Sequence, residues 1–153
     1  MKRTVCKIVV LLLLLSISLL TFSSCMSHIE DTNGEDDHSL CSLTDEDMVD
    51  GGSYLQQGST RSEINGKVKI RINKFSGVNT IESIRIRGEA KKLTLTATVE
   101  SGNFRLFIVK DGEIFADLKA DGTQDSVTFS DNGEYHLRIA GESAHIEIAY
   151  EIE

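Results

Sequence analysis

The sequence of 153 residues contains no proline and no tryptophan, and it has only three cysteines and 6% aromatic residues. Three cysteines spread along the chain do not make a disulfide framework, so a folded domain must be stable without one. Basic residues are also in short supply, with 16 lysines and arginines against 24 acidic residues and a net charge of -8. Because nucleic-acid binding requires a basic surface, this balance excludes nucleic acid as a partner.

The first 24 residues have the composition of an export signal. Residues 1–7 carry Lys2, Arg3 and Lys7 and no acid, and residues 8–22 form an apolar run that only two serines and one threonine interrupt. A helix needs about 20 apolar residues to cross a bilayer, so the run is short for a permanent span. The pattern predicts a signal peptide whose positive end stays in the cytoplasm.

The residues that end this segment indicate which kind of signal it is. Phe22, Ser23, Ser24 and Cys25 place small residues directly before a cysteine. This resembles the lipobox of bacterial lipoprotein precursors, although the family more often has leucine in place of Phe22. The resemblance implies that a diacylglycerol is attached to the Cys25 thiol, that the chain is cut before Cys25, and that acyl chains such as palmitate hold it at a membrane outside the cytoplasm. The alternative is an ordinary secretory signal with an incidental cysteine.

The residues after the signal divide into two regions of different composition. Residues 25–66 contain ten acids against one base, Arg61, and show no sustained hydrophobic periodicity, which predicts a flexible acidic tether. Thr44 and Asp47 have the spacing of a helix cap, so a short and marginal helix before Gly51 is an option within the tether. Cys41 has no partner cysteine there, and the acidic runs do not match the spacing of a calcium loop.

From residue 67 the sequence alternates between apolar and polar residues, which is the pattern of half-buried strands. The alternation predicts about eight short strands over 67–153, namely 67–72, 84–87, 92–100, 103–110, 113–118, 125–130, 134–140 and 144–152. Turn residues punctuate them at Ser101-Gly102, Asp111-Gly112, Asp121-Gly122, Asn132-Gly133 and Gly141-Glu142. The fold class expected is all-β, an antiparallel β-sandwich or jelly-roll-like module that follows the signal peptide and the tether.

The strand pattern also predicts a candidate docking surface. If Ser101-Gly102 and Asp111-Gly112 are two-residue turns, Ile108 faces Phe115 on the core side. The opposite face then exposes an apolar patch, which we call the predicted patch: Phe107, Val109, Ile114, Ala116 and Leu118. Such a patch suits a protein partner or self-association. Two alternatives stay open, namely that a bulge at Asp111-Gly112 changes the pairing, or that a neighbouring segment, such as the acidic tether around Tyr54-Leu55, covers the patch.

The sequence offers little for catalysis. With a turn at Gly141-Glu142, His136 would lie opposite Glu147 on a polar face, which is a surface pair rather than a metal site. No nucleophile and base can be assembled from the spacing of serine, cysteine and histidine, and the paired acids lie at turns. We therefore expect neither an enzyme nor a bound metal or cofactor.

The function expected is a lipid-anchored, extracytoplasmic and non-enzymatic binding or interaction module of the bacterial cell envelope. The membrane is one partner, through the lipid on Cys25, and the location is the cell membrane or the outer membrane. The alternative is a carbohydrate- or peptidoglycan-associated accessory domain, which the lack of tryptophan makes second choice.

Overall fold

The computed structural model describes residues 43–153. The predicted signal (1–24), the lipidation residue Cys25 and the tether as far as residue 42, with Cys41, lie outside the described residues. The described elements, in chain order, are α2 (Asp45–Asp50), β1 (Tyr54–Ile64), β2 (Lys67–Ile86), β3 (Lys91–Lys110), β4 (Glu113–Leu118), β5 (Asp121–Phe129) and β6 (Gly133–Ile152).

The six strands form one antiparallel sheet in the order β1-β2-β6-β3-β4, with β5 also paired to β3. The predicted all-β antiparallel class is confirmed. The strands are fewer and longer than the predicted eight, because β2, β3 and β6 each have 20 residues and run through positions where the alternation suggested a break.

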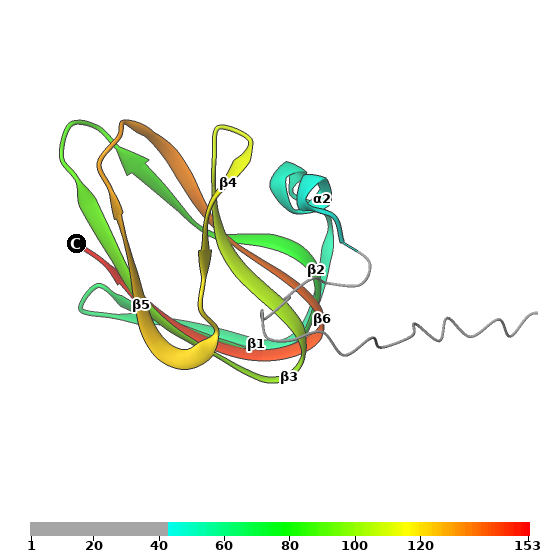
Figure 1. Cartoon of the computed structure of the whole chain (residues 1–153). Coiled ribbons are helices and arrows are strands. Elements are labelled where there is room, and N and C mark those ends of the chain that lie inside the picture. The colour runs from blue at the N-terminus through cyan, green and yellow to red at the C-terminus, as the bar shows by residue number, and fades with distance from the viewer. Residues whose placement is uncertain (1–42) are drawn as a thin grey trace, which may run out of the picture. The chain divides into compact units, whose positions relative to one another are not determined.

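The three long strands bend in the middle, so that the sheet folds over into two layers (Figure 1). The first layer contains β1, residues 67–72, 144–152 and 91–99 of the long strands, and β5. The second layer contains residues 78–86, 133–140 and 103–110 of the same strands, and β4. The strand register shifts at each bend, as expected where β-bulges turn a strand from one layer to the next.

The inner faces of the two layers share one hydrophobic core. The first layer contributes residues such as Ile70, Leu95 and Ile148, and the second layer contributes residues such as Leu106 and Leu137. Such a core needs both layers because one sheet alone leaves a face exposed to water.

Two of the predicted turns are bends of this kind. Strand β6 pairs with β3 on both sides of Ser101-Gly102, and β2 pairs with β6 on both sides of Gly141-Glu142. The predictions of hairpins at these positions are therefore wrong. Gly102 has a φ of 81°, and a Cβ there would lie 2.7 Å from the Ala144 Cα, so the bend requires glycine.

The other predicted turns have mixed outcomes. Asp111-Gly112 is a two-residue hairpin turn, with φ angles of 52° and 79° and with Lys110 paired to Glu113. Asn132 lies in the connection between β5 and β6, as predicted, and Gly133 is the first residue of β6. Asp121-Gly122 instead forms the start of β5, so no hairpin closes there.

The predicted tether is wrong for residues 45–64, which form α2 and β1. The proposed cap does begin the helix: Thr44 Oγ1 accepts from the Asp47 amide, and the Asp47 carboxylate accepts from the Thr44 amide at 3.0 Å. Strand β1 gave no hydropathy signal because all its residues are exposed, and backbone pairing to β2 holds it in place.

Candidate functional site

The predicted patch is not an open surface. Phe107, Val109 and Leu118 are only 0%, 2% and 8% exposed, and Ile114 and Ala116 are partly buried. The expectation that these five side chains form an exposed patch is therefore wrong.

A β-bulge is the first cause. Val109 pairs with Ile114 but Ile108 pairs with Ala116, so Phe115 is an extra residue in β4. Leu118 consequently joins the main core opposite Leu106. Phe115, which the sequence placed in the core, is 46% exposed and lies with its ring 5.2 Å from the Tyr135 ring.

The helix α2 is the second cause. It packs on the outer face of the second layer and forms a separate apolar cluster, which we call the helix-covered cluster: Met48, Val78, Phe107, Val109 and Ala140, with Leu43, Val49 and Ile114 at its margin. The segment that covers the patch is thus α2 rather than Tyr54-Leu55. Met48 is completely buried in this contact.

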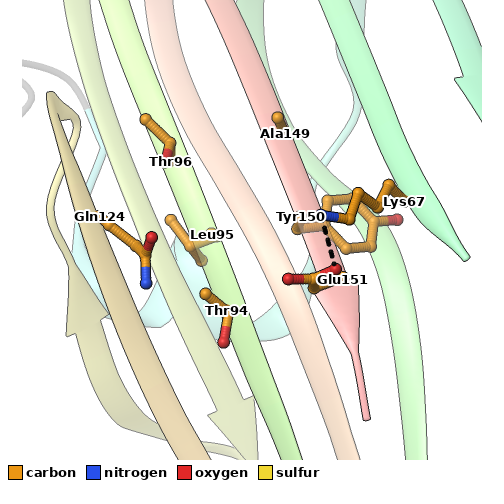
Figure 2. Close-up of a pocket in the computed structure, with 8 residues that line it drawn as sticks. All are labelled: Lys67, Thr94, Leu95, Thr96, Gln124, Ala149, Tyr150 and Glu151. Atoms are coloured by element: carbon orange, nitrogen blue, oxygen red, sulfur yellow. Dashed lines mark ion pairs between the residues drawn. The ribbon is translucent and has the colours of Figure 1, made fainter.

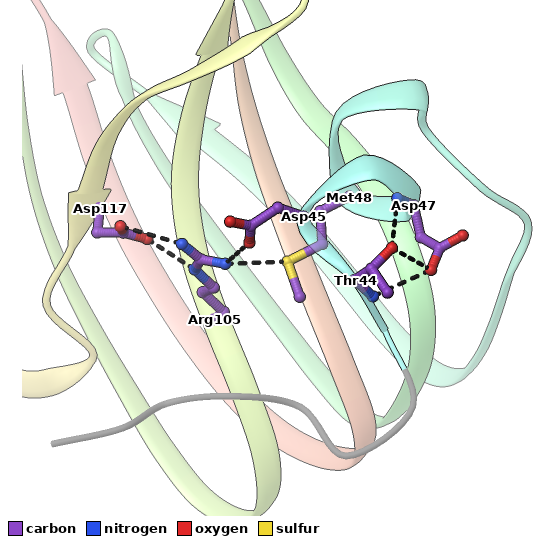
Figure 3. A network of polar contacts seen from close by, with 6 residues as sticks. All are labelled: Thr44, Asp45, Asp47, Met48, Arg105 and Asp117. Carbon is purple, nitrogen blue, oxygen red and sulfur yellow. Dashed lines mark hydrogen bonds and ion pairs between the residues drawn. The ribbon is translucent and has the colours of Figure 1, made fainter.

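Arg105 of β3 fastens the first turn of α2 (Figure 3). Its Nη1 lies 2.5 Å from Asp45 Oδ1 and 3.4 Å from the Met48 sulfur, while its Nε lies 2.7 Å from Asp117 Oδ1 of β4. The hydrogen bonds to Asp117, and to a lesser extent that to Asp45, raise the pKa of Arg105 above its ordinary value despite partial burial. The guanidinium also lies over the Phe107 ring, 5.6 Å from its centre.

Arg138 of β6 fastens the other end of α2. Its Nη1 donates to the carbonyl oxygens of Met48, at 2.8 Å, and Val49. Free carbonyls at the end of a helix attract a cation, so this position suits an arginine. Partial burial lowers the pKa of Arg138 from its ordinary value.

His136 does not lie opposite Glu147 as predicted, because β6 does not turn at Gly141-Glu142. His136 Nδ1 lies 3.1 Å from Ser83 Oγ, and His145 Nδ1 lies 3.0 Å from a Glu100 carboxylate oxygen. His28 and His38 lie outside the described residues. Among residues 43–153, no group of three or more histidine, cysteine or acidic side chains is placed to hold a metal ion.

Three polar side chains form a hydrogen-bonded network between the two layers. Arg61 of β1 donates to Glu82 Oε2 at 2.9 Å and to the Tyr150 hydroxyl at 3.0 Å, and that hydroxyl donates to Glu82 at 2.7 Å. Burial and the bond to Glu82 raise the pKa of Tyr150, so its hydroxyl stays protonated at neutral pH. Because Arg61 and Tyr150 belong to the first layer and Glu82 to the second, these hydrogen bonds connect the two layers.

The outer face of the first layer carries a shallow depression with a volume of about 190 Å³ (Figure 2). Strands β2, β3, β5 and β6 provide the residues around it: Lys67, Thr94, Leu95, Thr96, Gln124, Ala149, Tyr150 and Glu151. Leu95 and Tyr150 direct their side chains into the core, so they contribute mainly backbone. Ala149 forms the floor because its side chain is short between longer neighbours.

Several polar side chains around the depression have hydrogen-bonding groups without a partner in the described chain. Lys67 and Glu151 form an ion pair of 3.3 Å at one side. Thr94, Thr96 and Gln124, on the other side, make no side-chain hydrogen bond within residues 43–153. Sequence alternation placed the threonines on a polar face but not the depression, because that depends on which residues β5 and β6 place beside them.

The chain is only distantly similar to known proteins. No family model and no curated protein matches the chain. Among solved structures, a cupin domain from Bordetella pertussis has 12% identity and a TM-score of 0.33, covering 65% of this chain and 97% of its own. A mutant of a family 29 carbohydrate-binding module has 11% identity and a TM-score of 0.33, covering 68% and 81%. Neither likeness is close enough to carry a functional argument. The helix within residues 43–153 is too short and too polar to cross a membrane.

Proposed function

We propose that this protein is a lipid-anchored, extracytoplasmic binding module of the bacterial cell envelope, and that it binds a hydroxyl-rich glycan in the depression around Ala149. The anchor rests on the basic, apolar and lipobox-like segments that end at Cys25. Two or three acyl chains on that residue would hold the module at a membrane, since each buried CH₂ contributes about 0.8 kcal/mol.

The burial of the predicted patch shifts the preferred ligand from a protein to a saccharide. An apolar docking surface is no longer open, whereas the depression has polar groups without partners. The observation that carries the proposal is the set of unpaired neutral donors and acceptors on Thr94, Thr96 and Gln124 around an apolar floor. Sugar hydroxyls can both donate to and accept from such groups.

The depression suits binding rather than hydrolysis of a glycan. Glycoside hydrolysis generally needs two carboxyl groups across the scissile bond. Glu151 is the one acid among the residues that line the depression, and Lys67 already pairs with it. Because the site is shallow and lacks an exposed aromatic ring, we expect weak binding that gains strength on a repetitive polymer.

Sedimentation with purified, insoluble peptidoglycan tests this proposal. We expect the full chain to cosediment, and Gln124→Ala and Ala149→Leu each to reduce the bound fraction at least threefold. Thr128→Ala is the matched control, because Thr128 lies on the same face of β5 but outside the depression. Absence of binding by the unmodified chain, or equal binding by all variants, would contradict the proposal.

A further inference from the structure

Three of the four free strand edges in the described part of the chain are interrupted. Strand β4 has the bulge at Phe115, and β5 has a register shift opposite Thr96 to Thr98. The edge formed by residues 78–86 of β2 has a register shift between Thr80 and Glu82. Arg61 Nη1 also donates a hydrogen bond to the Ile81 carbonyl oxygen there, at 2.8 Å. Such irregularities prevent another strand from pairing at an edge.

The fourth edge, residues 59–64 of β1, is regular. It keeps a constant register with β2 from Ser59 opposite Ile72 to Ile64 opposite Lys67. Every residue of this segment is exposed, and the Ile64 side chain is 70% exposed. Its outer edge therefore offers unpaired backbone groups in the geometry that an added strand needs.

We propose that a second copy of this chain occupies this edge, with the two β1 strands antiparallel and the twofold axis through Ser62. In this register, Arg61 lies opposite Glu63 of the second copy, and the symmetry repeats the pair on the other side of the axis. Glu63 forms no ion pair within residues 43–153, and the Arg61 side chain, although it already pairs with Glu82, is 46% exposed and so can also reach this contact. The first layers of the two copies then form one continuous sheet.

The charges of Arg61 and Glu63 favour this register over the two registers that differ from it by a shift of two residues. If one strand slips by two residues in one direction, Arg61 of one copy lies opposite Arg61 of the other. If it slips by two residues in the other direction, Glu63 of one copy lies opposite Glu63 of the other. Like charges directly opposite each other destabilise a strand pair, whereas opposite charges stabilise it. On the other face the register places Thr60 opposite Ile64, which covers an exposed apolar side chain.

Cysteine cross-linking tests both the contact and its register. With Cys6, Cys25 and Cys41 replaced by serine, the full chain carries one new cysteine, Ser62→Cys or Thr60→Cys, and is treated with a mild oxidant. The two Ser62 Cα atoms would lie about 5 Å apart, within reach of a disulfide. The two Thr60 Cα atoms would be about 14 Å apart and out of reach.

We expect at least tenfold more disulfide-linked dimer from Ser62→Cys than from Thr60→Cys. Adding Glu63→Arg to Ser62→Cys should reduce the dimer at least fivefold, while circular dichroism verifies the fold. Equal cross-linking at the two positions, or no effect of Glu63→Arg, would overturn the proposal. The outcome does not depend on the lipid or on glycan binding.

Discussion

The Arg138 guanidinium donates to the Met48 carbonyl oxygen at 2.8 Å and so joins the middle of β6 to the last turn of α2. A helix of six residues is too short to be stable alone in water. Its position over the helix-covered cluster therefore depends on this bond, on the contact of Arg105 with Asp45, and on the burial of Met48. Together these contacts hold α2 over the helix-covered cluster, whose apolar side chains would otherwise be exposed to water.

Replacing Arg138 should weaken the attachment of α2 to the sheet. We expect Arg138→Ala to lower the free energy of unfolding by about 1–3 kcal/mol, because the charged hydrogen bonds to the carbonyls of Met48 and Val49 are lost. Urea denaturation measures the change. Arg85→Ala is the control, since its exposed pair with Glu134 should contribute less than about 1 kcal/mol. Equal losses in the two variants would contradict the role assigned to Arg138.

The helix cap gives a second, local prediction. Thr44→Ala removes the side-chain oxygen that accepts from the Asp47 amide, and such caps contribute about 1 kcal/mol. We expect this loss in urea denaturation, together with faster proteolysis around residues 43–53. Thr44→Ser keeps the oxygen and should behave like the unmodified chain. If alanine and serine at this position were equivalent, the cap would have no part in holding α2.

The cap and the alternation were predictable because they depend on neighbouring residues. Thr44 and Asp47 are three positions apart, and the outcome agrees with the sequence. The alternation of apolar and polar residues also changes phase at Gly102, and this change was visible in the sequence. A turn and a bulged bend both produce such a change, so the sequence did not distinguish them. Strand β6 decides between them, since it pairs with residues on both sides of Gly102, and that partner lies some 40 positions away.

The candidate surfaces were less predictable for the same reason. Residues 45–50 are so acidic that one buried methionine, Met48, gave no signal that the segment packs on Phe107. The depression around Ala149 follows from the cross-strand register of Thr96 with Ala149 and with Gln124, and no local pattern encodes this register.

The network around Glu82 predicts a dependence of stability on pH. Burial opposes ionisation of Glu82, but hydrogen bonds from Tyr150 and Arg61 outweigh it and lower the pKa below its ordinary value of 4.5. A carboxylate with a lowered pKa in the folded state stabilises the fold at pH values above 4.5, and this contribution is lost as the pH falls through the folded-state pKa. The unmodified chain should therefore lose stability as the pH falls below about 4.5 and through the folded-state pKa of Glu82.

Urea denaturation at pH 7 and at pH 3.5 measures this effect. Glu82→Gln should be less stable than the unmodified chain at pH 7 and should show a smaller further loss at pH 3.5. Glu134→Gln, which alters an exposed pair with Arg85, serves as the control. An acid-induced loss in Glu82→Gln as large as that of the unmodified chain would show that Glu82 is not responsible.

Metabolic labelling with a palmitate analogue tests the lipid anchor, on which the proposed location and function both depend. The unmodified chain and Cys41→Ala should incorporate the label and fractionate with membranes, because the lipid is attached to Cys25. Cys25→Ala should incorporate none and should lose the membrane association. Equal labelling of Cys25→Ala and the unmodified chain, or no labelling of either, would contradict the account.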